Sequence, residues 1–346
     1  MVTAWMANQG RFLPGALAWT YSVFWLFDTR VAYKLVLGIV LVGAIAVVGL
    51  LVARLTGRWK AAAVFVPIAC GLMQFRTTYD GLTSYAGLVP LTTALTVGAL
   101  VVAISRRGAR WGVLALVLYS MALVTYEPVI LFAPIMVAIV VWIRRSWLPA
   151  LAVAIPAVVQ MGLAVVLRLS MQGPQAPAYI VDLEPGVVLV TFAKQLVAAF
   201  PLSQWILAPG TVPVISPGSV VAGVLAVGIP TFLLLVNLGR SPLQAAGAQI
   251  VAIASLGAWM WLTPSALIAI TVRWQVELLW GHGYLSVVYG YFGLALCMLA
   301  GFLVVERHVA GGRPGVVLAW RYGSALLVGA LVALTFAGNL TVAGIA

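Results

Sequence analysis

The sequence predicts an all-α fold, a polytopic transmembrane helical bundle with juxtamembrane helices on its outer face. Two observations lead to this prediction. Hydrophobic residues make up 64% of the 346 residues and charged residues only 8%, whereas soluble domains carry about 25% charged residues. The apolar residues also form blocks that match the roughly 20 residues needed to cross a bilayer core about 30 Å thick. An ordinary soluble enzyme, a disordered chain and a secreted disulfide scaffold are thereby excluded.

Ten apolar blocks are long enough to be interpreted as spans. They cover residues 31–53, 59–75, 85–104, 110–125, 127–143, 147–168, 218–238, 244–271, 285–305 and 316–338. A further block, 12–27, is short and rich in Trp, Tyr and Phe. We interpret it as an amphipathic helix that lies flat on the outer surface. The alternative is an eleventh span, which would put Met1 on the inside.

The distribution of charge predicts the orientation. Basic residues collect in alternate loops, which should be cytoplasmic by the positive-inside rule: Arg54, Arg58 and Lys60; Arg106, Arg107 and Arg110; Arg144 and Arg145; Arg240; Arg307 and Arg313. The opposite loops hold most of the acids: Asp80, Glu127, Asp182, Glu184 and Glu277. The net charge of +12 therefore indicates membrane orientation and no nucleic-acid partner.

This pattern divides the chain into four segments. Residues 1–30 form an external juxtamembrane segment, 31–169 hold the first six spans, 170–217 form an external loop, and 218–346 hold the last four spans. The external loop begins with a Pro/Gly stretch at 173–177 and carries a helical pattern at 186–200. We expect an interfacial helix there, between two rigid turns.

The strongest candidate for chemistry is the segment 74–81, at the outer end of the second predicted span. Arg76, Tyr79 and Asp80 lie within five residues of one another. A carboxylate there is suited to hold a hard divalent cation or to act as a base, and an arginine to pair with phosphate oxygens. The alternative is a solvated turn at a helix end.

A second candidate is Glu127, which stands between two apolar spans with almost no loop around it. An acid so close to hydrocarbon usually faces a cavity or a partner. Pro128 suits the first turn of the following helix, so an N-terminal capping role for the acid is the alternative.

The third candidate is a stretch of basic, acidic and aromatic residues before the ninth predicted span: Arg273, Trp274, Glu277, Trp280, His282 and Tyr284. The histidine is a candidate metal ligand or acid/base group, and the aromatic rings suit a carbohydrate or an isoprenoid phosphate. An interfacial aromatic belt is the alternative. Weaker candidates are Lys194 in the external loop and Arg11 near the start, for which solvated charges are the default.

Several features are missing from the sequence. There is no Walker loop, no dinucleotide fingerprint, no His-Glu-x-x-His and no nucleophile elbow. The two cysteines lie in apolar runs and carry no metal or redox motif. Ionisable residues near the middle of the spans are also nearly absent, which favours a site at the membrane surface over a translocation path.

The organisation resembles the GT-C superfamily of integral-membrane glycosyltransferases, in particular its bacterial members. The residues that carry the likeness are Gly10-Arg11-Phe12-Leu13-Pro14, Phe27-Asp28-Thr29-Arg30, Arg54-Leu55-Thr56-Gly57-Arg58, Tyr79-Asp80, Tyr126-Glu127 and Trp280-Gly281-His282-Gly283-Tyr284. The likeness covers most of the chain, with motifs of low specificity. It departs from the superfamily in one respect: the first span and the acid of the first outer loop have no counterpart here, and nothing before Asp28 is acidic.

The resemblance implies catalytic roles for Asp80 and Glu127, and a divalent cation, Mg²⁺ or Mn²⁺, held by Asp80 and His282. It further implies substrate binding by the charged and aromatic candidates: Arg76, Tyr79, Lys194, Arg273, Trp274, Glu277, Trp280, His282 and Tyr284. An arginine, either Arg76 or Arg273, would neutralise the lipid-phosphate leaving group.

The expected activity is therefore transfer of a sugar from a polyprenyl-phosphate donor to an acceptor at the outer face of a bacterial inner membrane, in cell-envelope synthesis. Two alternatives remain open at this point. A transporter or flippase predicts polar residues spread along a path through the bilayer. A non-catalytic membrane subunit predicts that Asp80, Glu127 and Glu277 point apart.

Overall fold

The computed structural model describes residues 12–105, 108–170, 180–240, 243, 245–309 and 311–344. Arg11, Arg106, Arg107 and the predicted Pro/Gly stretch at 173–177 lie outside these residues. The regular secondary structure of the described residues is helical, apart from an isolated antiparallel bridge between Val181 and Thr271. The predicted all-α class is confirmed.

Among the described residues, eight helices are long and apolar enough to cross a bilayer. They are Arg30–Thr56, Ser84–Ser105, Glu127–Arg144, Leu148–Ser170, Pro217–Leu238, Gly247–Ala269, Val287–Val309 and Pro314–Ala343. The protein is therefore a multi-pass membrane protein with about eight spans. The expectation of ten spans was wrong by two, because the blocks predicted at 59–75 and 110–125 form helices of only 14 and 17 residues.

The two short helices end for identifiable reasons. Helix α4 (Trp59–Leu72) stops where Asn339 binds the backbone: its Oδ1 accepts from the Phe75 N–H at 2.7 Å, and its Nδ2 donates to the Met73 carbonyl at 2.9 Å. Helix α6 (Ala109–Thr125) follows Gly108, which has a φ of 103°, and ends before a 3₁₀ turn that starts at Glu127. Side-chain capping and backbone conformation thus cut short segments whose composition is apolar enough to span.

Among the described residues, four other helices lie outside the spans: α2 (Pro14–Leu26), α9 (Pro185–Ala198), α10 (Ser203–Leu207) and α14 (Val272–Glu277). The first two were expected at 12–27 and 186–200. Helix α2 has 13 residues, which at about 1.5 Å per residue give roughly 20 Å, too short to cross a hydrocarbon core by itself. The predicted location on the membrane surface stays a prediction.

The contacts divide the chain into two compact units. The first unit comprises Met1–Leu51, Gly81–Phe192 and Thr263–Leu278, and the second comprises Val52–Asp80, Ala193–Leu262 and Leu279–Ala346. Helices α3 (Arg30–Thr56), α9 and α13 (Gly247–Ala269) each contain a point where the chain passes from one unit to the other. This grouping by contacts is a different division from the four consecutive segments of the expected membrane topology, which stay a prediction.

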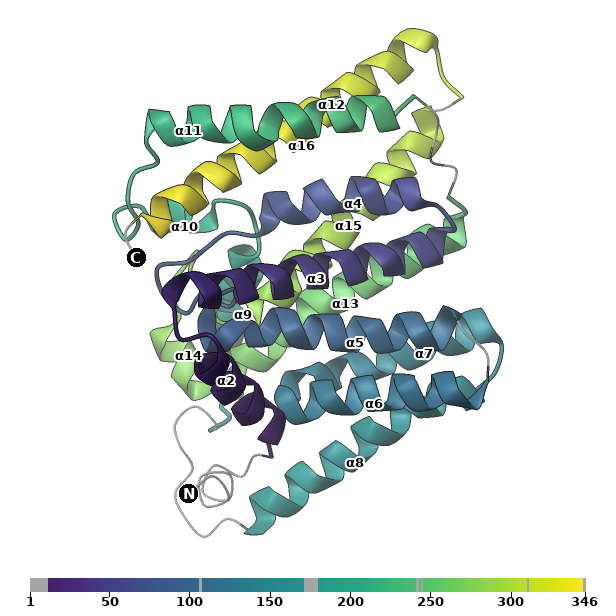
Figure 1. Ribbon diagram of the computed structural model, residues 1–346, viewed down its shortest axis with the longest axis vertical. Helices are drawn as coiled ribbons and strands as arrows, with labels where there is room; N and C mark the ends of the chain where they lie inside the picture. The colour runs from purple at the N-terminus through teal and green to yellow at the C-terminus, as the bar shows by residue number, and fades with distance from the viewer. Residues whose placement is uncertain are drawn as a thin grey trace. The chain divides into compact units, whose positions relative to one another are not determined.

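In the first unit, helices α5 (Leu88–Ser105), α6, α7 (Ala133–Arg144) and α8 (Leu148–Ser170) pack side by side (Figure 1). Helix α2 lies against α6, so closely that a Cβ at Gly15 would collide with Thr125. The indole of Trp19 on α2 donates to the Ala86 carbonyl at 2.9 Å. These contacts fix the aromatic N-terminal helix on the body of the first unit.

In the second unit, α4 packs against α15 (Val287–Val309) and α16 (Pro314–Ala343), and α11 (Pro217–Gly223) and α12 (Ile229–Leu238) pack along α16 (Figure 1). Although α4 is too short to count as a span by length, it runs beside α16 from Val64, which lines a pocket with Arg321 near the start of α16, to Gly71, so its two ends lie at opposite ends of the second unit. The Thr335 hydroxyl donates to the Gly71 carbonyl at 2.6 Å, and Asn339 then holds Met73 and Phe75. Segment 74–80 is thereby positioned at the end of the second unit where α16 terminates.

Candidate functional site

A buried arginine organises this end of the second unit. Arg76 is only 4% exposed. Its Nε donates to the Tyr291 hydroxyl at 2.8 Å, Nη1 donates to the carbonyls of Gly281 and His282, and Nη2 donates to the carbonyl of Ala198. One guanidinium therefore ties segment 74–80 to the C-terminal end of α9, to the 281–282 turn and to α15.

Two amide side chains support the same junction. The Gln74 Nε2 donates to the Phe200 carbonyl at 2.7 Å and to the Ser203 hydroxyl at 3.2 Å, and the Gln204 Nε2 donates to the Phe75 carbonyl at 2.6 Å. Both glutamines are fully buried. Because these bonds join stretches more than 120 residues apart in sequence, the turn after α9 and segment 74–80 form one polar junction, which we call the Arg76 junction.

His282 lies at the edge of the Arg76 junction, between two glycines. The backbone at Gly281 and Gly283 is left-handed, with φ values of 78° and 66°. A Cβ at Gly281 would also stand 2.5 Å from the Ser203 carbonyl oxygen. Both positions therefore require glycine, because L side chains disfavour this conformation and the space is occupied.

The imidazole of His282 is buried and hydrogen-bonded on both sides. Its Nδ1 lies 3.0 Å from the Thr78 hydroxyl and its Nε2 lies 3.0 Å from the Thr211 hydroxyl. Burial lowers the pKa of His282, and the positive charge of Arg76 lowers that pKa further. A neutral imidazole with one donor and one acceptor nitrogen matches two hydroxyls, which can act in either role.

Aromatic side chains and an acid also lie in the two segments that carry this histidine and its partner Thr78. The rings of Tyr79 and Tyr284 meet edge to face at 5.9 Å, and Tyr79 and Trp280 are 39% and 43% exposed. Asp80 is half-buried and close enough to act electrostatically on the Tyr291 hydroxyl. The sequence-predicted residues Arg76, Tyr79, Asp80, Trp280, His282 and Tyr284 thus all belong to one end of the second unit.

Tyr79 adopts a strained backbone conformation, with a φ of 51°. Non-glycine residues with positive φ are uncommon, and they cluster at functional sites. Here the strained residue directly precedes Asp80 and contributes its ring to the pair with Tyr284. Leu202, in the turn after α9, shares this conformation with a φ of 56°, so both turns of the Arg76 junction carry backbone strain.

Lys194 also belongs to the second unit, on helix α9 and half-buried. Its neighbour Gln195 joins α9 to the start of α15: its Oε1 accepts from the Tyr284 N–H at 2.8 Å, and its Nε2 donates to the Ser286 hydroxyl at 3.3 Å. The amide next to the predicted lysine is thus a structural connection to the Gly-His-Gly turn.

The remaining predicted residues belong to the first unit. Arg273 makes a salt bridge of 3.0 Å with Glu277 one helical turn away, and its guanidinium lies 4.8 Å from the centroid of the Trp274 ring. Trp274 is buried, and Arg273 and Glu277 are about 40% exposed. Glu127 is half-buried in the first turn of a 3₁₀ helix and is followed by Pro128, which is the setting of the capping alternative.

A metal-binding group of three or more His, Cys, Asp and Glu side chains is absent from the described residues. Asp80 offers a carboxylate to a cation. His282 would first have to give up one of its two threonine hydrogen bonds to do so. A cation at Asp80 would therefore draw its other ligands from water and from substrate oxygens, as Mg²⁺ commonly does at phosphate sites.

Sequence reasoning missed much of the polar network. Gln74 lies in the segment 74–81 but was given no role, and Asn339, Gln204 and Thr211 were not among the predicted residues. Amides within an apolar helical background are the signal that could have found the first two, because such groups seek hydrogen-bond partners when they are buried. Their partners could not be found from one sequence, because they lie 100 to 270 positions away.

No protein-family model, no curated protein and no solved structure matches the chain. Identity therefore rests on the sequence and the structure themselves. Eight apolar helices of spanning length and an all-α architecture establish the chain as a polytopic helical membrane protein.

Proposed function

We propose that this protein is a membrane glycosyltransferase of the GT-C type that transfers a sugar from a polyprenyl-phosphate donor at the outer face of a bacterial inner membrane. The observation that carries the proposal is the gathering of Tyr79, Asp80, Trp280, His282 and Tyr284 around the Arg76 junction at one end of the second unit. A carboxylate can act as a base or hold a cation at a phosphate, exposed aromatic rings can stack on a sugar, and the buried His282 holds the turn through its two threonine bonds.

Each group has a role that its surroundings support. Exposed tyrosine and tryptophan rings offer stacking surfaces for a sugar. The Asp80 carboxylate serves as the base for the acceptor hydroxyl or as the ligand of a divalent cation bound to the donor phosphate. Arg76 holds the turn in place through its carbonyl contacts, so in this proposal it is a positioning residue. Arg273 and Glu127 belong to the first unit, and the roles expected for them from the sequence remain predictions.

The structure also supports a rigid site. The Gly-His-Gly turn is bound from three sides: by Arg76 through its carbonyls, by Thr78 and Thr211 through the imidazole, and by Gln195 through Tyr284. Groups held in this way need little reorganisation when substrate binds, which is the condition for effective electrostatic stabilisation.

The decisive experiment is a transfer assay in proteoliposomes with a panel of polyprenyl-phosphate-linked hexoses and pentoses. Replacing Asp80→Asn should lower the rate by at least about a hundredfold, the range typical for loss of an acid/base or phosphate-stabilising group. The matched control is Glu184→Gln, which alters an exposed acid in the first unit and should leave the rate unchanged.

Three results would count against the proposal. An Asp80→Asn variant that transfers sugar at the parent rate would show that the acid has no catalytic role. Absence of transfer with every donor, combined with movement of a fluorescent lipid across the bilayer, would instead support the flippase alternative. Absence of both activities would favour a non-catalytic subunit.

A further inference from the structure

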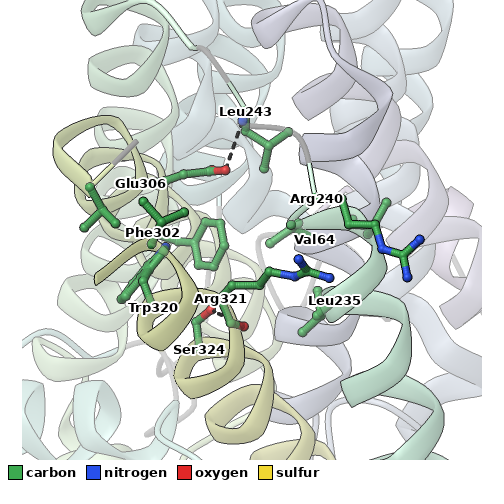
Figure 2. Close-up of a pocket in the computed structure, with 13 residues that line it drawn as sticks. Val64, Leu235, Arg240, Leu243, Phe302, Glu306, Trp320, Arg321 and Ser324 are labelled. Carbon is green, nitrogen blue, oxygen red and sulfur yellow. Dashed lines mark hydrogen bonds between the residues drawn. The ribbon is translucent and has the colours of Figure 1, made fainter. Parts of the chain in front are cut away.

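A separate cavity lies inside the second unit, among the helix ends that carry basic residues. It has a volume of about 110 Å³, several times the roughly 10–15 Å³ that one water molecule needs. Helices α4, α12, α15 and α16 contribute its walls, including Val64, Leu235, Phe302, Glu306 and Arg321 (Figure 2). None of these residues belongs to the Arg76 junction, so the cavity is a second site.

Glu306 supplies a buried acid to this cavity. The residue is only 9% exposed, and its Oε1 accepts from the Leu243 N–H at 3.0 Å. Its Oε2 is buried and has no hydrogen-bond partner among the described residues. Lys60 acts on this carboxylate electrostatically. A buried carboxylate oxygen without a donor is costly, so the site favours a ligand that brings one.

Two arginines line the same cavity. The Nε of Arg321 on α16 donates to the Val236 carbonyl at 2.7 Å. The two terminal amino groups of its guanidinium have no hydrogen-bond partner among the described residues. Arg240, at the end of α12, is exposed. Neither arginine has an ion-pair partner within the described part of the chain, which includes all seven acids. Two like charges around one small cavity favour an anion between them.

The remaining polar atoms fit the same ligand. The Nε1 of Trp320 is buried and, in the described residues, has no acceptor, and Ser324 places a hydroxyl on the cavity wall. Figure 2 shows the Arg321 side chain extending across the pocket, with Arg240 farther along the same side and Glu306 directed towards Leu243. The cavity thus presents donors for a phosphate and an acceptor for an amine.

We propose that this cavity binds a phosphate joined by a short linker to a primary amine, the headgroup chemistry of an aminophospholipid such as phosphatidylethanolamine. The arginines would bind the phosphate and the Glu306 Oε2 would accept from the ammonium group. The apolar walls formed by Leu235, Phe302 and Val64 suit the carbons that link the headgroup to its chains. Basic pockets between transmembrane helices are known sites for lipid headgroups.

The position of the cavity favours a membrane lipid as the source. The helix ends that form it adjoin the loops that contain Arg58, Lys60, Arg307 and Arg313, which the positive-inside rule places at the cytoplasmic surface. A lipid of the inner leaflet would enter between helices with its headgroup at this depth. The inference is independent of the proposed transfer activity, which concerns the other end of the second unit.

The test is lipid binding to the purified full chain, measured by native mass spectrometry after delipidation in detergent. Phosphatidylethanolamine should bind at least about tenfold more tightly than either of two control lipids, because tenfold corresponds to one charge-assisted hydrogen bond. Phosphatidylglycerol lacks the amine, and the quaternary ammonium of phosphatidylcholine has no N–H to donate. Competition with soluble O-phosphoethanolamine shows whether the site binds the headgroup of a lipid or a soluble phosphoamine. Weak competition assigns the site to the lipid, and competition at the lipid's own affinity assigns it to a soluble phosphoamine.

Two variants separate the two halves of the headgroup. Glu306→Gln keeps an oxygen for the Leu243 N–H and should abolish the preference for phosphatidylethanolamine while binding of phosphatidylglycerol stays the same. Arg321→Gln should weaken the binding of every phosphate-containing ligand. The control Arg313→Gln removes the same charge from an exposed position at the start of α16. It should change neither the preference for phosphatidylethanolamine nor the affinity for phosphate-containing ligands.

The proposal is overturned if the three lipids bind equally well to the parent protein. It is also overturned if Glu306→Gln, melting at the parent temperature, still prefers phosphatidylethanolamine. If Glu306→Gln melts at a lower temperature than the parent protein, both proteins are melted again with added lipid. The parent should then gain thermal stability from phosphatidylethanolamine, and the variant should not. An equal gain in both would overturn the assignment of Glu306.

Discussion

Arg76 binds three distant stretches of the second unit: it donates to backbone carbonyls at the end of α9 and in the 281–282 turn, and to the Tyr291 hydroxyl on α15. A buried guanidinium in such a position is costly to replace, because its removal leaves several carbonyl oxygens without donors. We expect Arg76→Lys to lower the stability of the protein in detergent by roughly 2–4 kcal/mol, since an ammonium cannot reproduce the planar fork. Arg168→Lys, on an exposed part of α8, is the matched control. Equal melting temperatures for the two variants would contradict the structural role of Arg76.

His282 makes stability depend on pH. Its pKa is lowered in the folded protein, first by burial and then by Arg76, and its unfolded pKa is about 6.5. The neutral form is therefore favoured by folding. As pH falls below about 6.5, the unfolded state takes up a proton before the folded state does, so stability decreases towards the folded pKa.

This pH dependence can be measured directly. The melting temperature of the parent should fall between about pH 7 and pH 5, and His282→Gln should remove that part of the fall while lowering stability at pH 8. His308→Gln, which alters the exposed second histidine, should keep the parental pH profile. A parental profile in the His282→Gln variant would show that the imidazole does not govern it.

The residues at the candidate site were only partly predictable. Arg76, Tyr79, Asp80 and His282 drew attention because charged and aromatic residues are rare in this apolar chain. The roles of Arg76 and His282 were not predictable, because their partners are carbonyls and threonine hydroxyls contributed by distant turns. No local pattern encodes that Ala198 or Thr211 would face them.

At the scale of elements, α13 and α15 approach each other through glycine. A Cβ on Gly293 would stand 2.5 Å from the Gly257 carbonyl oxygen and 2.7 Å from the Trp261 backbone nitrogen. Close backbone approach through small residues is the main source of helix association in a bilayer. The indole of Trp261 donates to the Leu196 carbonyl at 3.1 Å, so the same contact also supports α9.

Gly293→Ala should therefore force the two helices apart and lower the melting temperature by several degrees, a loss of about 1–3 kcal/mol typical of overpacking. Gly301→Ala, on the same helix, meets nothing within 4 Å and should be neutral or slightly stabilising, because alanine favours helix. Circular dichroism melts of both variants in detergent check the pair. Equal losses would mean that the contact is not tight.

The number of spans was the main error at this scale. Apolar composition predicted the long helices well, and eight of the ten expected blocks have helices of spanning length. It could not predict where a helix stops within an apolar segment. Asn339 ends α4 by binding Met73 and Phe75, and that residue is more than 260 positions away.

At the scale of the molecule, the second unit has two polar ends. One carries the Arg76 junction with Asp80, and the other carries the cavity of Arg321 and Glu306. The positive-inside rule predicts that the end with the cavity faces the cytoplasm.

This orientation can be tested in a chain whose two native cysteines are replaced by alanine. An impermeant maleimide should label Val214→Cys in intact cells and Gly311→Cys only after permeabilisation. Both positions are exposed, and the reverse pattern would contradict the orientation.

The most direct test of the proposed function is a structure of the full chain in a lipid nanodisc with a polyprenyl phosphate and Mg²⁺ added. The account predicts density for the phosphate beside Asp80 and the Tyr79–Tyr284 pair, with the isoprenoid chain running along the membrane surface of the second unit. Phosphate density confined to the Arg321 cavity, or a hydrated path through the helices with an empty Asp80 end, would contradict it.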